Sequence, residues 1–224
     1  MAEVFVVSAV RSPITRRRGP LSDVHPVDLA AQVIEGAVER AGVDPSAIDD
    51  IILGCVGQVG AQAYNIARTA GLSAGLPESV PGVTVDRQCG SSQQAIQFAA
   101  QAIRSGDQDI VVAGGVEVMS LVGIGASGSS ELAMGHPRGG ARWRQRFEGI
   151  EISQFNGAEL VARQWGISRE QLETFALRSH TRASEAIDRG LFDDEIVPVG
   201  DVKRDNGARP DTTLEKMAAL DPVV

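Results

Sequence analysis

The chain has 224 residues, with 29 acidic and 21 basic side chains and a formal net charge of −8. This acidic balance excludes a protein that coats nucleic acid or an anionic membrane, because both partners require a positive surface potential. Hydrophobic residues make up 43% of the chain and charged residues 22%, which is typical of a globular protein with an apolar core.

No apolar run approaches the roughly 20 residues of a membrane-spanning helix, and the amino terminus lacks the basic flank of a signal peptide. We therefore expect a cytoplasmic protein that binds neither membrane nor nucleic acid. The two cysteines, Cys55 and Cys89, are too few for a disulfide framework, and neither has the spacing of a metal ligand. With only three scattered histidines, we expect no metal site.

Strands and helices alternate in the first half of the chain. Buried strands are predicted by four apolar runs, at residues 4–9, 51–56, 83–86 and 110–113. Helical spacing of apolar residues predicts a helix from Pro26 to about Gly42, a short turn at Asp44, and further helices over 67–72 and over 95–103, the last ending at Gly106. The alternation predicts an α/β layer with a largely parallel sheet up to about residue 116.

The pattern changes after Glu117. Residues 122–150 are rich in Gly, Ser and Arg and show little periodicity, which is typical of a functional loop. Helical spacing returns over 157–165 and again after Ser168, which begins a predicted capping box, and the second helix ends near Gly190. A brief strand is expected over 196–199. Residues 214–222 have a helical composition with no closing strand after them, so we interpret the chain as cut or disordered beyond Val224.

Cys89 lies where a predicted strand, 83–86, passes into a helix. Unpaired N–H groups and the positive end of the helix dipole stabilise a thiolate at such a position, and the Cys89 N–H can receive an acyl oxyanion. The alternative is that Cys89 is a small buried apolar residue, as most free cysteines are. Cys55 lies inside an apolar strand with no helix start beside it, which favours a structural or pocket-lining role.

The chain resembles the thiolase family, the acetyl-CoA C-acyltransferases, in a series of short motifs that follow the family's order. The motifs occupy residues 9–14, 54–56, 65–68, 86–92, 113–120, 168–170, 194–198 and 209–214. The resemblance implies the amino-terminal αβα half of a five-layered thiolase-like fold, with a mixed, largely parallel sheet. It also implies that residues 1–118 carry the nucleophile, that 119–224 form an inserted, α-rich loop domain covering coenzyme A, and that the carboxyl-terminal half is absent.

By this resemblance, Cys89 accepts an acyl group as a thioester and passes it to coenzyme A or to the α-carbon of acetyl-CoA. The reaction is thiolytic cleavage of a 3-ketoacyl-CoA, as in fatty acid β-oxidation, or the reverse Claisen condensation. Coenzyme A is a substrate, and no permanently bound cofactor is implied. The family's activating histidine, its second cysteine and its oxyanion-hole groups come from the carboxyl-terminal half, so the chain alone should accept an acyl group poorly. His136, in a Gly-His-Pro tripeptide, lies in the loop region and is interpreted as a coincidence.

Two residues are candidates for contact with coenzyme A. Ser153 lies where short-chain thiolases carry a His-Met pair, and the Ser-Gln-Phe sequence that replaces the pair favours larger, branched or steroid-derived acyl groups. Arg209 matches an arginine near the coenzyme A nucleotide, where a guanidinium suits adenine stacking or a phosphate. A basic cluster in the loop region suits either the phosphates or a subunit contact, and it comprises Arg138, Arg142, Arg144 and Arg146.

Two other functions are weighed against an acyl-CoA thiolase. A decarboxylating ketoacyl synthase is disfavoured, because these enzymes carry a Thr-Ala pair before a cysteine followed by serines, whereas Cys89 follows Arg-Gln. A non-catalytic thiolase-like protein that binds acyl-CoA or lipid is favoured by the missing half and disfavoured by the retained Cys89. The resemblance further implies a homodimer or homotetramer.

Overall fold

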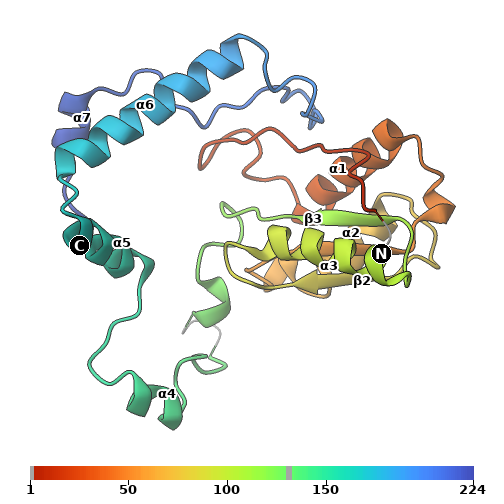
Figure 1. Cartoon of the computed structure of the whole chain (residues 1–224), viewed down its shortest axis with the longest axis horizontal. Coiled ribbons are helices and arrows are strands. Elements are labelled where there is room, and N and C mark those ends of the chain that lie inside the picture. Colours follow the sequence, from red (N-terminus) through yellow and green to blue (C-terminus); the bar gives the residue numbers. More distant parts are fainter. Residues whose placement is uncertain (1–2, 130–132) are drawn as a thin grey trace. The chain divides into compact units, whose positions relative to one another are not determined.

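The computed structural model describes residues 3–129 and 133–224, which form two compact units (Figure 1). The first unit comprises Met1–Ser129 and Asp193–Asp205, and the second comprises Ser130–Phe192 and Asn206–Val224. Residues 193–205 thus return to the first unit in the middle of the second. These bounds differ from the functional boundary expected at residue 118, which stays a prediction.

A parallel three-stranded sheet forms the centre of the first unit. Its strands are β1 (Asp50–Gly54), β2 (Gly82–Val85) and β3 (Val111–Gly115), in the order β2-β1-β3. Ile52 lies opposite Val83 on one side and Ala113 on the other. Three of the four predicted strands and the parallel arrangement are therefore confirmed.

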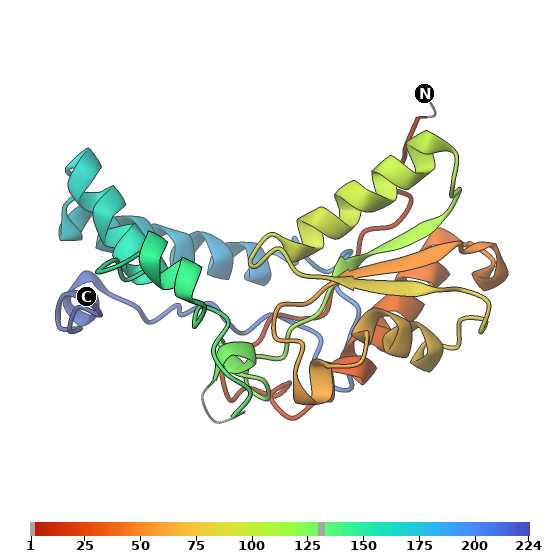
Figure 2. The same cartoon turned by 90° about the horizontal axis from the view of Figure 1, so that it is seen from below.

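Helices cover both faces of this sheet (Figure 2). On one face lie α1 (Pro26–Ala41) and α2 (Ile66–Ser73), and on the other lies α3 (Ser91–Ser105). Side chains alternate along β1, so Ile51 and Leu53 join the core beneath α1 and α2, while Ile52 packs against Ala95 and Ala99 of α3. The α/β prediction is confirmed. Short 3-10 turns at Pro45–Ala47, Gly60–Gln62 and Ala126–Gly128 complete the unit.

The glycines at the ends of β1 and β3 allow α3 to approach the sheet closely. A Cβ atom placed on Gly54 would lie 2.4 Å from the carbonyl carbon of Ser91 and 2.4 Å from the nitrogen of Ser92. A Cβ atom on Gly115 would lie 2.1 Å from the Ser92 hydroxyl oxygen. The first turn of α3 therefore rests directly on the backbone of two strands, a contact that only glycine permits.

The strand expected over residues 4–9 is absent, and that prediction is wrong. These residues are extended, but β3 pairs only with β1 among the described strands. A cleft of 710 Å³ is lined jointly by residues 4–12, α1, α3 and β3, and Val6 is 79% exposed. An apolar, β-branched composition favours extended backbone, but a strand also needs a neighbouring edge, which this segment does not reach.

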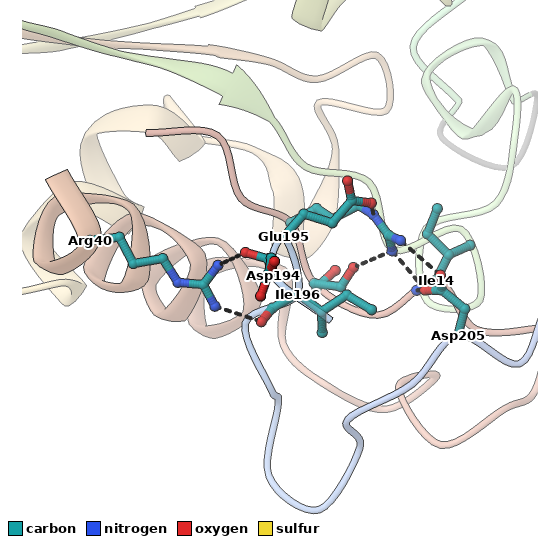
Figure 3. A network of polar contacts seen from close by, with 8 residues as sticks. Ile14, Arg40, Asp194, Glu195, Ile196 and Asp205 are labelled. Carbon is teal, nitrogen blue, oxygen red and sulfur yellow. Dashed lines mark hydrogen bonds and ion pairs between the residues drawn. The ribbon is translucent and has the colours of Figure 1, made fainter. Parts of the chain in front are cut away.

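The strand expected over 196–199 is likewise reduced to single bridges, from Ile196 to Arg11 and from Val199 to Val202. Polar contacts hold this returning segment, residues 193–205, against the amino-terminal part of the first unit (Figure 3). The Arg11 guanidinium donates to Glu195 Oε1 at 2.6 Å and to both carboxylate oxygens of Asp205 at 2.7 and 2.8 Å. We call Arg11, Glu195 and Asp205 the polar clasp.

Three further hydrogen bonds support the polar clasp. The backbone N–H of Ile14 donates to Asp205 Oδ1 at 2.7 Å, and the Arg40 guanidinium donates to the carbonyls of Asp194 and Ile196. Burial alone would raise the pKa of the Asp205 carboxyl, but the hydrogen bonds from Arg11 and Ile14 outweigh burial and hold this pKa below its usual value.

The second unit is helical in its described part. It contains α4 (Ala141–Arg146), α5 (Gln154–Trp165), α6 (Arg169–Asp188) and α7 (Leu214–Ala218). The capping box is confirmed: Ser168 Oγ accepts from the Gln171 N–H at 3.2 Å, and Gln171 Oε1 accepts from the Ser168 N–H at 2.8 Å. The short helix α4 was not expected, because six residues carry too little periodicity to be recognised. None of the described helices is long and apolar enough to cross a membrane.

Replacing Arg11 with Met should destabilise the first unit by about 1–3 kcal/mol at pH 7, since it removes hydrogen bonds from a largely buried Asp205. The pKa of Asp205 is lower in the folded state than in the unfolded state. The Asp205 carboxylate therefore stabilises the fold above the unfolded-state pKa of about 3.9, and this stabilisation is lost as pH falls through the folded-state pKa. The free energy of unfolding in urea should therefore fall less for Arg11→Met than for the wild type as pH drops below about 4.

The matched control is Arg163→Met, which removes an ion pair between two exposed side chains, Arg163 and Glu159. We expect a change within about 1 kcal/mol and an unaltered pH dependence. Equal losses in the two variants would contradict a stabilising polar clasp.

Replacing Gly54 with Ala should cost about 1–3 kcal/mol of unfolding free energy, because the new methyl group would overlap the backbone of α3. Gly123→Ala is the control, since a Cβ atom there meets nothing within 4 Å. Urea titrations monitored by circular dichroism measure both. A Gly54→Ala protein as stable as Gly123→Ala would show that α3 shifts away at no cost.

Candidate active site

Cys89 lies in the turn between β2 and α3, immediately before Gly90, the residue that precedes the first turn of α3. Its side chain is exposed. The predicted position of Cys89 at a strand–helix junction is confirmed, whereas the alternative of a small buried apolar residue is wrong.

The backbone of this turn is strained and held by side chains. Gln88 has a φ of 48°, in the left-handed region that residues other than glycine rarely adopt. The Gln88 N–H donates to Asp86 Oδ1 at 2.7 Å, and Ser91 Oγ accepts from the Arg87 N–H at 2.9 Å while it donates to the Gln88 carbonyl at 2.6 Å. A turn fixed in this way gives Cys89 a defined position, and strain of this kind is concentrated at functional sites.

Cys55, unlike Cys89, is buried. It follows β1, is 1% exposed, and donates its backbone N–H to the Val85 carbonyl at 3.0 Å. Burial raises the pKa of the Cys55 thiol to about 12, and the negative charges of Glu117 and Asp86 add to the effect. Cys55 is therefore a neutral thiol at physiological pH, which agrees with the structural role expected of it.

A polar cluster beside Cys55 was not foreseen from the sequence. Gln62 is fully buried, and its Nε2 donates to Glu117 Oε1 at 2.9 Å and to the Gly57 carbonyl at 2.9 Å. The Glu117 carboxylate also accepts from the N–H groups of Val56 and Gly57, both at 3.0 Å. The sequence offers one indication, because Glu117 lies two residues after the end of β3 and Gln62 lies among small residues after β1.

The two residues expected to contact coenzyme A lie in the second unit, whereas Cys89 lies in the first. Ser153 precedes α5, and its hydroxyl accepts from the Phe155 N–H at 3.2 Å. Arg209 is exposed, and its backbone N–H donates to His180 Nδ1 at 3.3 Å. Their roles in binding coenzyme A stay predictions.

The basic cluster is exposed and lies on and beside α4. The Arg138 guanidinium stacks 5.5 Å from the Trp143 ring centroid, and that of Arg146 lies 5.6 Å from the Phe147 ring. His136 Nδ1 accepts from the Arg138 N–H at 3.1 Å, which gives His136 a local structural role. Within residues 3–129 and 133–224, no group of three or more His, Cys, Asp or Glu side chains is arranged to hold a metal ion.

Comparison with known proteins agrees with this architecture. Residues 4–224 match the family model for the thiolase N-terminal domain. The chain is 49% identical to a steroid 3-ketoacyl-CoA thiolase of Mycobacterium tuberculosis, covering 100% of this chain and 56% of that protein. It is 43% identical to a β-ketoadipyl-CoA thiolase of Pseudomonas aeruginosa, with coverage of 99% and 59%.

A solved structure is also similar, the crystal structure of the Bacillus anthracis acetyl-CoA acetyltransferase. Its TM-score is 0.82 at 38% identity, and the match covers 97% of this chain and 58% of that one. The chain thus spans little more than half the length of the relatives it matches. With its sheet, its strand–helix turn and the match over residues 4–224, the chain belongs to the thiolase family and corresponds to the family's N-terminal domain.

Proposed function

We propose that the complete protein is an acyl-CoA thiolase in which Cys89 is the nucleophile. The observation that carries the proposal is an exposed cysteine in a strained, hydrogen-bonded turn before α3, in a chain of the thiolase family. Cys55, the other cysteine, is buried and protonated and cannot serve.

In the proposed reaction, the Cys89 thiolate attacks the 3-keto carbon of a 3-ketoacyl-CoA. The bond between C2 and C3 then breaks, the acyl group stays on Cys89 as a thioester, and C2 takes up a proton as acetyl-CoA leaves. The thiolate of coenzyme A next attacks the thioester and releases a shortened acyl-CoA together with free Cys89. The Claisen direction reverses these steps. The two proton transfers need an acid and a base, which we assign to the part of the enzyme beyond this chain.

We infer that the second unit contacts coenzyme A, through Ser153 near the pantetheine arm and Arg209 near the nucleotide. Coenzyme A is then a substrate that binds and leaves. The Ser-Gln-Phe sequence at 153–155 supports an acyl group larger than acetoacetyl, and so does the similarity to a steroid and to a β-ketoadipyl-CoA thiolase. We further propose a cytoplasmic homodimer or homotetramer.

The two cysteines should differ in their rate of alkylation. In this chain, iodoacetamide at pH 7.5 should label Cys89 at least about tenfold faster than Cys55, because Cys55 is buried and its pKa is raised to about 12. Peptide mass spectrometry after timed quenching measures both rates, and Cys55→Ala confirms the assignment. Equal rates in the folded protein would argue against Cys89 as the accessible nucleophile.

The acyl-transfer role itself requires the complete enzyme. There, Cys89→Ala should lower thiolysis of a 3-ketoacyl-CoA by at least about 10³-fold, since the covalent step is lost, while Cys55→Ala should retain most activity. Acid quenching should trap the acyl group on the peptide that contains Cys89. Binding of acyl-CoA without any acyl-Cys89 would favour a non-catalytic acyl-CoA-binding protein instead.

A further inference from the structure

We propose that Glu117 and Gln62 are positioning residues for Cys89, an inference that rests on the proposed function. They tie together the loops that follow β3 and β1, at the sheet edge from which the Cys89 turn begins. We call this pair the Glu117–Gln62 clamp. Neither residue belongs to the Cys89 turn, and they act on Cys89 through the backbone that they hold.

The clamp satisfies polar groups of both loops at once. Oε2 of Glu117 accepts from the Val56 N–H, and Oε1 accepts from the Gly57 N–H, so the carboxylate caps the residues that leave β1. Gln62 completes the arrangement, because its Nε2 donates to Glu117 Oε1 while its Oε1 accepts from the Val118 N–H at 2.8 Å. Gln62 is fully buried, so loss of Glu117 would leave one of its two amide hydrogens unpaired, while the other still bonds to the Gly57 carbonyl.

Hydrogen bonds connect the clamp to the end of β2, four residues before Cys89. The Val116 N–H, next to Glu117, donates to the Gly54 carbonyl at 3.0 Å, which locks the ends of β3 and β1 together. Cys55, next to Val56, donates its N–H to the Val85 carbonyl at the end of β2, just before the turn.

The clamp also acts on the Cys89 turn through α3. Ser91 and Ser92, in the first turn of α3, rest on Gly54 and Gly115, the last residues of β1 and β3. The spacing of those two strand ends therefore determines where the first turn of α3 lies. Cys89 stands two residues before Ser91, and Ser91 also holds the Gln88 carbonyl. The clamp bonds the chain just beyond Gly54 and Gly115, so it fixes the surface on which the nucleophile turn rests.

The carboxylate is needed for this geometry, because two N–H groups and one amide N–H₂ converge on it. Gln at position 117 has one carbonyl oxygen and a donor group, so it would bring an N–H₂ against the N–H of Val56 or Gly57 or against Gln62 Nε2. The fold can relax around such a mismatch at a modest cost. Acyl transfer is more demanding, because a displacement of about 1 Å at a reacting atom can cost about 10²-fold in rate.

The test is Glu117→Gln in the complete enzyme, with Glu39→Gln on the exposed surface of α1 as the matched control. For Glu117→Gln we expect kcat for thiolysis to fall about tenfold or more, with KM for coenzyme A within about twofold of wild type. Labelling of Cys89 by iodoacetamide should stay within about twofold, since an exposed thiol needs no exact alignment to react with a small reagent. Glu39→Gln should match wild type in all three measurements.

A kcat within twofold of wild type in folded Glu117→Gln would overturn the inference. A lower urea midpoint, followed by circular dichroism, would reveal a general loss of structure. Gln62→Met is then measured in its place, because it leaves Glu117 with both backbone donors. In that variant a kcat reduced at least threefold supports the clamp, and an unchanged kcat overturns it. A wild-type enzyme that forms no acyl-Cys89 overturns the proposed function as well, so the two failures are distinguishable.

Discussion

The close approach of α3 to the sheet is the constraint on which the rest of the first unit depends. Gly54 and Gly115 end adjacent parallel strands, and the absence of side chains there lets the first turn of α3 touch strand backbone. Parallel strands deliver their carboxyl ends to one edge, where ligands bind in open α/β sheets. The residues that follow the three strands, Cys55, Cys89 and Glu117, therefore gather at this edge although they are distant in sequence.

The two cysteines at this edge differ in exposure. Cys55 continues β1 into the core, and both burial and the neighbouring carboxylates oppose its ionisation. Cys89 follows β2 by a few residues, yet the left-handed conformation of Gln88 turns the chain into α3 and leaves the cysteine exposed. The difference arises from backbone conformation, because both residues follow apolar strands of similar length. The proposed nucleophile is therefore presented to solvent by the strained turn.

Local sequence patterns predicted most helices and strands. The elements that were missed depend on pairing between segments that are distant in sequence. The capping box at Ser168 and the helix ends at Gly42 and Gly106 depend on residues within one turn, so the sequence was sufficient. Residues 4–9 have the composition of a strand, but pairing depends on whether a neighbouring edge is within reach, which composition does not encode. The clamp joins Gln62 and Glu117 across 55 positions, and no local pattern signals such a contact.

The returning segment 193–205 shows how such distant contacts organise the chain. Arg11 and Asp205 are 194 positions apart, yet their hydrogen bonds give the segment a fixed place beside the amino terminus. The second unit is therefore not a simple insertion, because an anchored part of the first unit interrupts it. An ion pair is well suited to hold this segment in place, since a bidentate guanidinium–carboxylate pair fixes orientation as well as distance.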